Sequence, residues 1–300
     1  MVSIIIPTYN QRGFLANAID SALSQSYKDI EIIVVDDNNP GTEARMKTEN
    51  LMSAYSNNPK VYYIQHEHNK NGSAARNTGF RASKGNFITF LDDDDYWAPN
   101  KLEKQLSYLE KHPEFDAVYC YLMVNGAKNP NRCYEGNIVK PYLMNYVSLQ
   151  TSAMMFTRKA VVAINGFDES FRRNQDYEFL IRFFFAGMQI GCVPEYLSYM
   201  NAIGDNRLSG EKLNELREKF LSTFENQLNY LESKEPGSKK AIIVANYVKV
   251  FESHVARRNF RMAFDIFKKY FPMAPVVFIK QCYMLLRNNI KRKASRMKAI

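Results

Sequence analysis

Residues 86–97 read Asn-Phe-Ile-Thr-Phe-Leu-Asp-Asp-Asp-Asp-Tyr-Trp, an apolar run that passes directly into four carboxylates. The run from Phe87 to Leu91 is typical of a buried strand, whereas aspartate is depleted from strands and adjacent like charges repel. The four acids, Asp92 to Asp95, therefore call for a compensating cation. Their oxygens suit a hard ion such as Mg²⁺ or Mn²⁺, which is usually held by one or two carboxylates together with substrate phosphates. The stretch predicts a metal–diphosphate site. The alternative is a solvated acidic turn in which Asp95 caps the next helix.

The preceding sequence repeats this pattern of a buried strand with a polar end. Val2 to Ile6 and Ile30 to Val35 are apolar apart from Ser3 and Glu31, as expected for strands buried on both faces. A third strand, Val61 to Ile64, precedes a predicted helix of small residues from Gly72 to Ser83. Alternating strands and helices predict a doubly wound, mostly parallel sheet, where ligands bind outside the carboxyl ends of the strands. The polar residues expected to meet at that edge are Tyr9, Asp36, Asp37 and Asp92 to Asp95.

A cation is also expected near this edge. Arg76 lies in the small-residue helix, whose glycines and alanines allow a close approach to the sheet or to a ligand. Because arginine suits bidentate contacts with anions, Arg76 could pair with the acidic cluster or with a diphosphate. A salt bridge with no ligand is the alternative.

Composition limits the class of protein. The 300 residues are 46% apolar and 13% aromatic, enough for one large α/β domain with an appendage. The net charge of +9 is uneven, because residues 254–300 hold twelve lysines and arginines against one acid, which gives +11 and leaves −2 elsewhere. A nearly neutral body argues against nucleic-acid binding. With no signal-peptide pattern and no apolar run of membrane-spanning length, a cytoplasmic protein is expected.

The cysteines carry no metal or redox spacing. We expect reduced thiols, three of them in the core, among Cys120, Cys133, Cys192 and Cys282.

The C-terminal third is predicted to be helical. Glu211 to Leu231 reads as one long helix and Ser233 to Lys240 as a linker. Tyr247 to Phe271 reads as a helical hairpin that turns at Arg258-Asn259. Its residues expected to face inward are Phe251, Val255, Phe260, Ala263, Phe264 and Phe267.

The last predicted helix, Val276 to Arg296, is amphipathic and basic. Its apolar residues are Val277, Ile279, Cys282, Leu285 and Leu286. Its basic residues, with Lys298 just beyond it, are Lys280, Arg287, Lys291, Arg292, Lys293 and Arg296, without one acid. Such a helix is typical of binding to an anionic membrane surface, where each basic residue contributes about 1 kcal/mol. Packing against the core or a protein partner is the alternative.

A further acidic residue lies at the start of a predicted helix in the segment from Val147 to Ser198. Asp176, in the run Gln175-Asp176-Tyr177-Glu178, occupies a position where the helix dipole favours an ionised carboxylate. An ionised carboxylate is what a general base requires. A helix-end charge without chemistry is the alternative. Asp168 and Glu169 are expected to hold the preceding turn.

Taken together, these motifs resemble the family 2 glycosyltransferases. The resemblance rests on four runs in order: Ile-Ile-Ile-Pro-Thr-Tyr-Asn at 4–10, Val-Val-Asp-Asp at 34–37, Ala-Ala-Arg-Asn-Thr-Gly at 74–79 and Phe-Leu-Asp-Asp-Asp-Asp at 90–95. Gly-Phe-Asp-Glu followed by Gln-Asp-Tyr-Glu adds to it. It implies a GT-A fold over residues 1–205, with a nucleotide-binding half at 1–111 and an acceptor-binding half at 112–205. Residues 206–300 would form the helical appendage.

The resemblance also implies roles for single residues. Pro7, Thr8 and Tyr9 would line the nucleotide base, and Asp37 would bind uracil. Asp92 and Asp94 would be the DxD pair, with Asp94 the direct ligand of Mn²⁺ or Mg²⁺ and Asp93 near the ribose. Asp176 would be the catalytic base of an inverting transfer. Relatives often carry a histidine near position 201, where this chain offers Asn201, Asp205 or Arg207.

The resulting hypothesis is a metal-dependent transfer from a UDP-sugar to a saccharide hydroxyl. The resemblance and the basic tail together suggest a lipid-linked acceptor in surface polysaccharide synthesis, on the inner face of the cytoplasmic membrane. One alternative is a sugar-1-phosphate nucleotidyltransferase, although Pro7-Thr8-Tyr9-Asn10 lacks the Gly-rich basic loop that a triphosphate needs. A dehydrogenase is disfavoured because no GxGxxG follows the first strand. The non-enzymatic alternative is a membrane-associated adaptor.

Overall fold

The computed structural model describes residues 1–10, 13–129, 132–201 and 210–297. Contacts divide the chain into two compact units. The first comprises Met1–Ile138 and Leu149–Ala202, and the second comprises Val139–Ser148 and Ile203–Ile300. The short segment Val139–Ser148 therefore groups with the C-terminal helices, although the family resemblance implied an acceptor-binding half that includes it.

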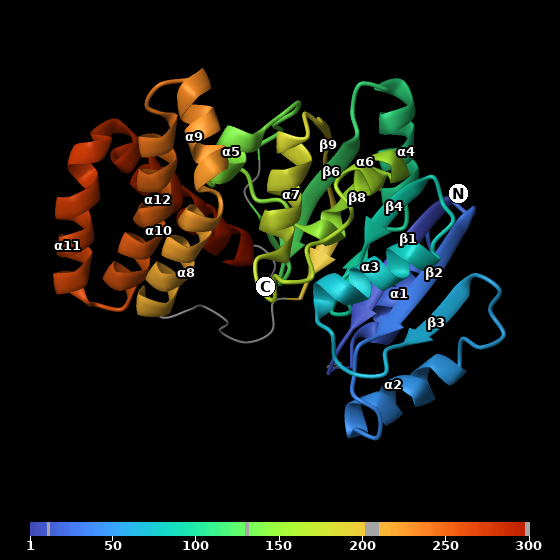
Figure 1. Ribbon diagram of the computed structural model, residues 1–300. Coiled ribbons are helices and arrows are strands. Elements are labelled where there is room, and N and C mark those ends of the chain that lie inside the picture. The colour runs from blue at the N-terminus through green and yellow to red at the C-terminus, as the bar shows by residue number, and fades with distance from the viewer. Residues whose placement is uncertain (11–12, 130–131, 202–209, 298–300) are drawn as a thin grey trace. The chain divides into compact units, whose positions relative to one another are not determined.

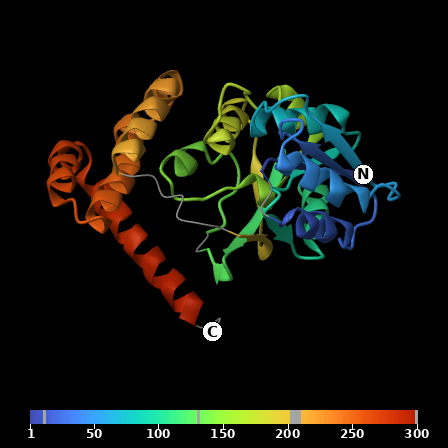
Figure 2. The ribbon, with the colours of Figure 1, turned by 90° about the horizontal axis from the view of Figure 1, so that it is seen from below.

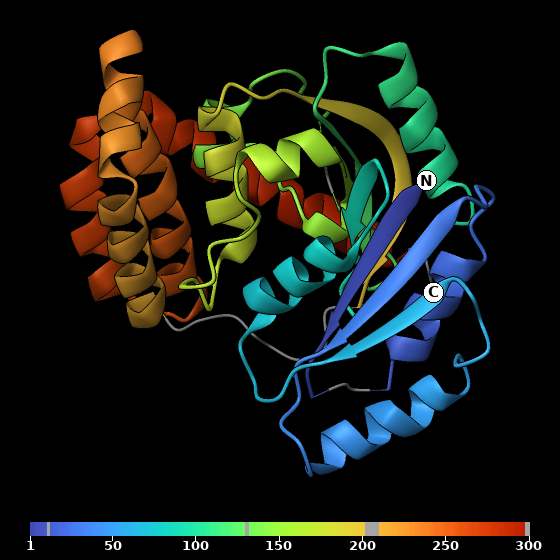
Figure 3. The same ribbon diagram turned by 45° about the vertical axis from the view of Figure 1, so that its right-hand side comes forward.

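The first unit is built on a mixed sheet whose N-terminal part is parallel. Strands β1 (Val2–Thr8), β2 (Ile30–Asp36), β3 (Val61–Gln65) and β4 (Phe87–Phe90) lie in the order β3-β2-β1-β4. Figure 3 shows β1, β2 and β3, in blue, running side by side in one direction. In their register, Thr8 pairs with Asp36. The polar ends of these strands therefore meet at one edge, and the predicted doubly wound sheet is confirmed.

The remaining strands extend the sheet beyond β4. β8 (Met154–Thr157) pairs antiparallel with both β4 and β6 (Ala117–Val124), and β6 is parallel to β9 (Ile190–Met200). β5 (Asp95–Trp97) is the last strand in the order and pairs antiparallel with β9, and β7 (Ala127–Lys128) pairs with β6.

Helices cover the sheet of the first unit. They are α1 (Leu15–Leu23), α2 (Glu43–Ser53), α3 (Gly72–Ala82), α4 (Lys101–Lys111), α6 (Arg158–Ala163) and α7 (Gln175–Phe185). The small residues of α3 explain how closely it packs, because a Cβ at Gly79 would lie 2.4 Å from Cγ2 of Ile5. A short 3₁₀ turn, η1 (Thr151–Ala153), precedes β8.

The alternative in which Asp95 caps the next helix is wrong. Asp95–Trp97 forms β5, which pairs antiparallel with Ser198–Met200 of β9, and α4 begins only at Lys101 after Asn100. Asp95 does not cap a helix, and its side chain is buried. The pairing with β9 joins residues about a hundred positions apart, so local sequence did not indicate it.

The first residue of α4 is a buried lysine. Lys101 is fully buried, and its Nζ lies 3.9 Å from the centre of the Trp97 ring and donates to Gln105 Oε1 at 2.8 Å. Burial lowers the pKa of Lys101 to about 8, because removal from water disfavours the ammonium.

The cysteine expectation is partly corrected. All four thiols are free, but only Cys120 and Cys192 are buried, while Cys133 is exposed and Cys282 is half-buried.

The second unit is a helical bundle. Its helices are α5 (Val139–Leu143), α8 (Gly210–Thr223), α9 (Glu225–Lys234), α10 (Ser238–Ala256), α11 (Phe260–Tyr270) and α12 (Pro275–Met297), with a 3₁₀ turn, η2 (Phe271–Met273), before α12. The hairpin turn at Arg258-Asn259 is confirmed, since Arg258 has a φ of 61° and Asn259 caps α11. The single helix expected over Glu211–Leu231 is instead two, and the linker is shorter than predicted.

The exposed apolar side chains of this bundle differ from those predicted. Phe260 and Phe264 were expected to face inward but are 64% and 63% exposed. On α12, which extends past α10 and α11 in Figure 2, Val277, Cys282 and Leu285 pack into the bundle core. A second set, spaced three and four residues apart and 58–78% exposed, forms what we call the apolar stripe: Val276, Ile279, Tyr283, Leu286 and Ile290. Within the described residues, no helix has both the length and the hydropathy to cross a membrane.

Candidate active site

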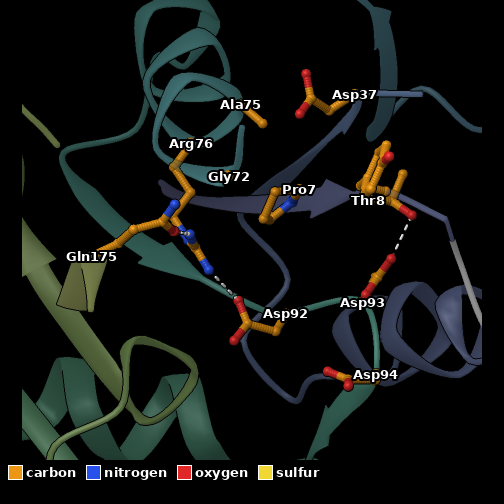
Figure 4. Close-up of a pocket in the computed structure, with 11 residues that line it drawn as sticks. Pro7, Thr8, Asp37, Gly72, Ala75, Arg76, Asp92, Asp93, Asp94 and Gln175 are labelled. Carbon is orange, nitrogen blue, oxygen red and sulfur yellow. Dashed lines mark hydrogen bonds and ion pairs between the residues drawn. The ribbon is translucent and has the colours of Figure 1, made fainter. Parts of the chain in front are cut away.

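A pocket of about 270 Å³ opens at the carboxyl ends of β1, β2 and β4 and at the N-terminal end of α3. Figure 4 shows the side chains that line it. The lining includes all eight pocket residues predicted from sequence: Pro7, Thr8, Tyr9, Asp37, Arg76, Asp92, Asp93 and Asp94. Gly72, Ala75 and Gln175 complete it. The convergence expected at this edge of the sheet is therefore present.

The acidic residues form a tight turn. The backbone N–H of Asp95 donates to the carbonyl of Asp92 at 3.0 Å, and Thr8 Oγ1 donates to a carboxylate oxygen of Asp93. Burial raises the pKa of Asp93 to about 7 and that of Asp95 to about 8. Both oxygens of Asp95 are buried and have no hydrogen-bond partner within the described chain. A cation close to this turn would favour the ionised form of these acids.

The donor set fits a hard divalent cation bound together with a ligand. Asp92, Asp93 and Asp94 present only oxygen atoms to the pocket. Among the residues that the structure describes, no three His, Cys, Asp or Glu side chains are arranged to hold a metal ion by themselves. Mg²⁺ and Mn²⁺ sites commonly take their remaining ligands from phosphates and water. Asp92 and Asp94 would therefore share an ion with a bound diphosphate.

Asp37 has a clear structural role. Its two carboxylate oxygens accept from four donors: His66 Nδ1 at 2.7 Å, Asn69 Nδ2 at 2.8 Å, Lys70 N at 2.7 Å and Asn71 N at 2.9 Å. These bonds fix the segment before α3, where Asn71 accepts from Ser73 N and Ala74 N as the N-cap. The predicted contact of Asp37 with uracil stays a prediction. The neighbouring Asp36 is buried against Arg45 and Tyr63.

Arg76 connects two parts of the site. Its Nη2 donates to Asp92 Oδ1 at 2.6 Å and its Nη1 donates to Gln175 Oε1 at 2.7 Å. The guanidinium lies over the ring of Phe167, 5.4 Å from its centre. Arg76 therefore pairs with Asp92, which the prediction and its salt-bridge alternative both allow, and its contact with a diphosphate stays a prediction.

Asp176 is the second residue of α7, as predicted, but its electrostatic environment differs from the expectation. Its carboxylate lies 3.5 Å from Thr151 N and 3.4 Å from Thr151 Oγ1. Burial raises its pKa, Arg76 acts in the opposite direction, and the charge of Asp92 raises it further. Burial is the largest of these influences, and it favours the neutral form of the Asp176 carboxyl.

The turn before α7 is fastened to α3. Asn77 Nδ2 donates to Phe167 O at 2.8 Å and to Glu169 Oε1 at 2.9 Å, and Phe167 N donates to Asn77 Oδ1. Asp168 accepts from Ser170 N at 2.8 Å. The turn-holding role predicted for Asp168 and Glu169 agrees with these bonds.

Some site residues were not predicted from sequence, chiefly Gln175 and Thr151. Gln175 directly precedes Asp176, and that adjacency was the available signal. Of the three candidates to replace the missing histidine, Asn201 donates to the carbonyl of Asp94 at 3.0 Å. Asp205 and Arg207 lie outside the described residues.

A curled, mostly parallel sheet with this polar pocket at its carboxyl edge defines an α/β protein of the GT-A class. The chain belongs to glycosyl transferase family 2, whose model matches residues 3–178. This membership favours the glycosyltransferase hypothesis over the nucleotidyltransferase and the adaptor.

Named relatives agree with this assignment. The chain is 33% identical over 199 residues to the uncharacterized glycosyltransferase RP339 of Rickettsia prowazekii, covering 61% of this chain and 58% of that protein. It is 31% identical over 191 residues to the amylovoran biosynthesis glycosyltransferase AmsB of Erwinia amylovora, covering 60% and 62%. The chain thus spans less than two thirds of the length of both relatives.

A solved structure shares the fold. The crystal structure of S. aureus TarS residues 1–349 in complex with UDP-GlcNAc superposes with a TM-score of 0.67 at 18% identity, covering 92% of this chain and 80% of that one.

Proposed function

We propose that the protein transfers a sugar from a nucleoside-diphosphate sugar, UDP-linked, to a hydroxyl of a saccharide acceptor with inversion at the anomeric carbon. The observation that carries the proposal is a pocket lined by residues at the ends of β1, β2 and β4 and by Arg76 and Gln175, with Asp176 next in the chain. The UDP-GlcNAc complex of the structurally similar TarS supports a UDP-sugar donor.

In this mechanism the side chains have separate tasks. Pro7, Thr8 and Tyr9 contact the nucleoside. Asp176 accepts the proton of the acceptor hydroxyl as its oxygen bonds to the anomeric carbon, while the bond from that carbon to the diphosphate oxygen breaks and UDP leaves. General base catalysis of this kind contributes about 10²–10⁴-fold.

The site must also neutralise the negative charge of the leaving diphosphate. A divalent cation bound by Asp94 and Asp92 would neutralise charge that develops on the leaving diphosphate. Arg76, already paired with Asp92, holds a positive charge beside the same edge.

The catalytic assignment is tested with Asp176→Asn. The variant keeps the shape of the side chain but cannot accept the proton, so transfer should fall by at least about 10²-fold. UDP binding, measured by calorimetry with Mn²⁺, should change less than threefold. Asp20→Asn, an acid on α1 outside the pocket, is the matched control. Retained transfer by Asp176→Asn would refute the assignment, and lost UDP binding would make Asp176 a ligand-binding or structural residue.

We further propose that the protein acts at the inner face of the cytoplasmic membrane on a lipid-linked saccharide in surface polysaccharide synthesis. The name of AmsB supports a polysaccharide product. The apolar stripe of α12, flanked by Lys280 and Arg287, supports contact with an anionic lipid surface.

Vesicle sedimentation tests the membrane proposal. The protein should bind vesicles rich in phosphatidylglycerol and not vesicles of phosphatidylcholine alone, and Ile279→Glu should reduce that binding at least tenfold. Val162→Glu, at an equally exposed position in the first unit, should not. Equal binding by Ile279→Glu and the wild type would exclude the stripe as the contact.

A further inference from the structure

Gln175 connects the helix of the candidate base with the acidic edge. Its Oε1 accepts from Arg76 Nη1 at 2.7 Å, and its Nε2 donates to the carbonyl of Phe171 at 3.1 Å. The side chain is therefore held at both ends, and it fixes one arm of the guanidinium while Asp92 fixes the other. Figure 4 shows this arrangement, with Arg76 between Gln175 and Asp92.

A side chain at position 72 would meet this contact closely, so that Arg76 and Gln175 would have to shift by a few tenths of an ångström to admit it. A Cβ at Gly72 would lie 3.1 Å from both Arg76 Nη1 and Gln175 Oε1. Gly72 has no left-handed φ, since it is the first residue of α3. A side chain at position 72 would therefore be opposed by the Arg76–Gln175 contact and not by backbone conformation.

Arg76 has little freedom to adopt another position. It is buried, its guanidinium lies over Phe167, and it interacts with the charges of both Asp92 and Asp176. We propose that Gln175 is a positioning residue that, together with Asp92, fixes the Arg76 guanidinium and so sets the charge that the candidate base Asp176 experiences. This inference rests on the proposed function of Asp176.

The contact can be broken from either side. Gln175→Met keeps the length of the side chain and removes both hydrogen bonds, while Gly72→Ala places a methyl group against the same pair of atoms. Since Arg76 lowers the pKa of Asp176, displacement of the guanidinium should raise that pKa. At pH values below the pKa of Asp176, a rise of one pKa unit reduces its ionised fraction about tenfold. Gln65→Met, at an exposed position of β3, is the control.

Two readouts test the inference. In ¹³C NMR titrations of aspartate carboxylates, with Asp176→Asn giving the assignment, both variants should titrate Asp176 at higher pH than the wild type. In assays with UDP-sugars, the acid limb of the plot of kcat against pH should shift to higher pH by the same amount, and the donor KM should change less than threefold. An unchanged Asp176 titration in both variants would overturn the inference even if stability fell. If both variants shift the titration of Asp176 but the wild type turns over no nucleotide sugar, the proposed function is refuted and the positioning role of Gln175 stands.

Discussion

The buried ammonium of Lys101 makes a quantitative prediction about stability. Folding lowers the pKa of Lys101 from 10.5 to about 8. Since one pKa unit corresponds to about 1.4 kcal/mol, burial of the charged form costs the folded state about 3 kcal/mol at pH 7. Below pH 8 both states carry the proton and the whole cost applies. Between pH 8 and 10.5 only the unfolded state binds the proton, so stability rises with pH there.

Lys101→Met removes this titration and keeps most of the aliphatic volume. At pH 7 the variant loses the hydrogen bond to Gln105 and leaves the Gln105 Oε1 unpaired, which together cost about 1–2 kcal/mol. Since about 3 kcal/mol of desolvation cost is removed, the free energy of unfolding should rise by about 1–2 kcal/mol. The sharper quantity is the difference in unfolding free energy between variant and wild type, which should fall by about 3 kcal/mol from pH 7 to pH 10.5. Terms that do not depend on pH cancel in this comparison.

The assay uses the single tryptophan of the chain. Trp97 lies against Lys101, so its fluorescence during urea unfolding reports on the unit that contains both residues. Unfolding curves of the two proteins at pH 7 and pH 10.5 give the four free energies. A variant–wild-type difference that is the same at both pH values would show that Lys101 is not desolvated, and would refute the reasoning.

Three further outcomes are expected. Gly79→Ala should lower the unfolding free energy by about 1–3 kcal/mol in urea titrations, because its Cβ would overlap Ile5; an unchanged value would mean that α3 can move away from the sheet. Asp37→Ala should cost at least about 2 kcal/mol, because four donors lose their acceptor, and should also weaken UDP binding in calorimetry; a stable variant would contradict the network. Asp94→Ala should abolish the effect of Mn²⁺ on UDP binding, whereas a retained Mn²⁺ effect would remove Asp94 from the metal site.

Much of the first unit could be predicted because its signals are local. Apolar runs such as Val2 to Ile6 mark buried strands, and the residues directly after them mark the sheet edge. The candidate pocket followed from that rule without any knowledge of side-chain contacts. Arg76 was placed near the edge by the small residues around it in the sequence.

The errors concern properties that only tertiary structure determines. Asp95 joins a strand because β9 offers a partner from far along the chain. The periodicity of α11 identified apolar positions such as Phe260 but could not tell which of them a neighbour covers. For Asp176, the helix start was visible in the sequence, whereas the burial that raises its pKa was not.

The assignment of Val139–Ser148 to the second unit has a practical consequence. Asn246 Nδ2 donates to Leu143 O at 2.9 Å, and Gln281 Nε2 donates to Met144 O at 2.6 Å, while Tyr142 and Leu143 are buried. Expression of a fragment that ends near residue 205 would leave this segment without its helical partners and expose its apolar side chains, so aggregation is to be expected. A shortened form for crystallisation or for swapping between relatives would need a replacement for residues 139–148 as well as a new C-terminus.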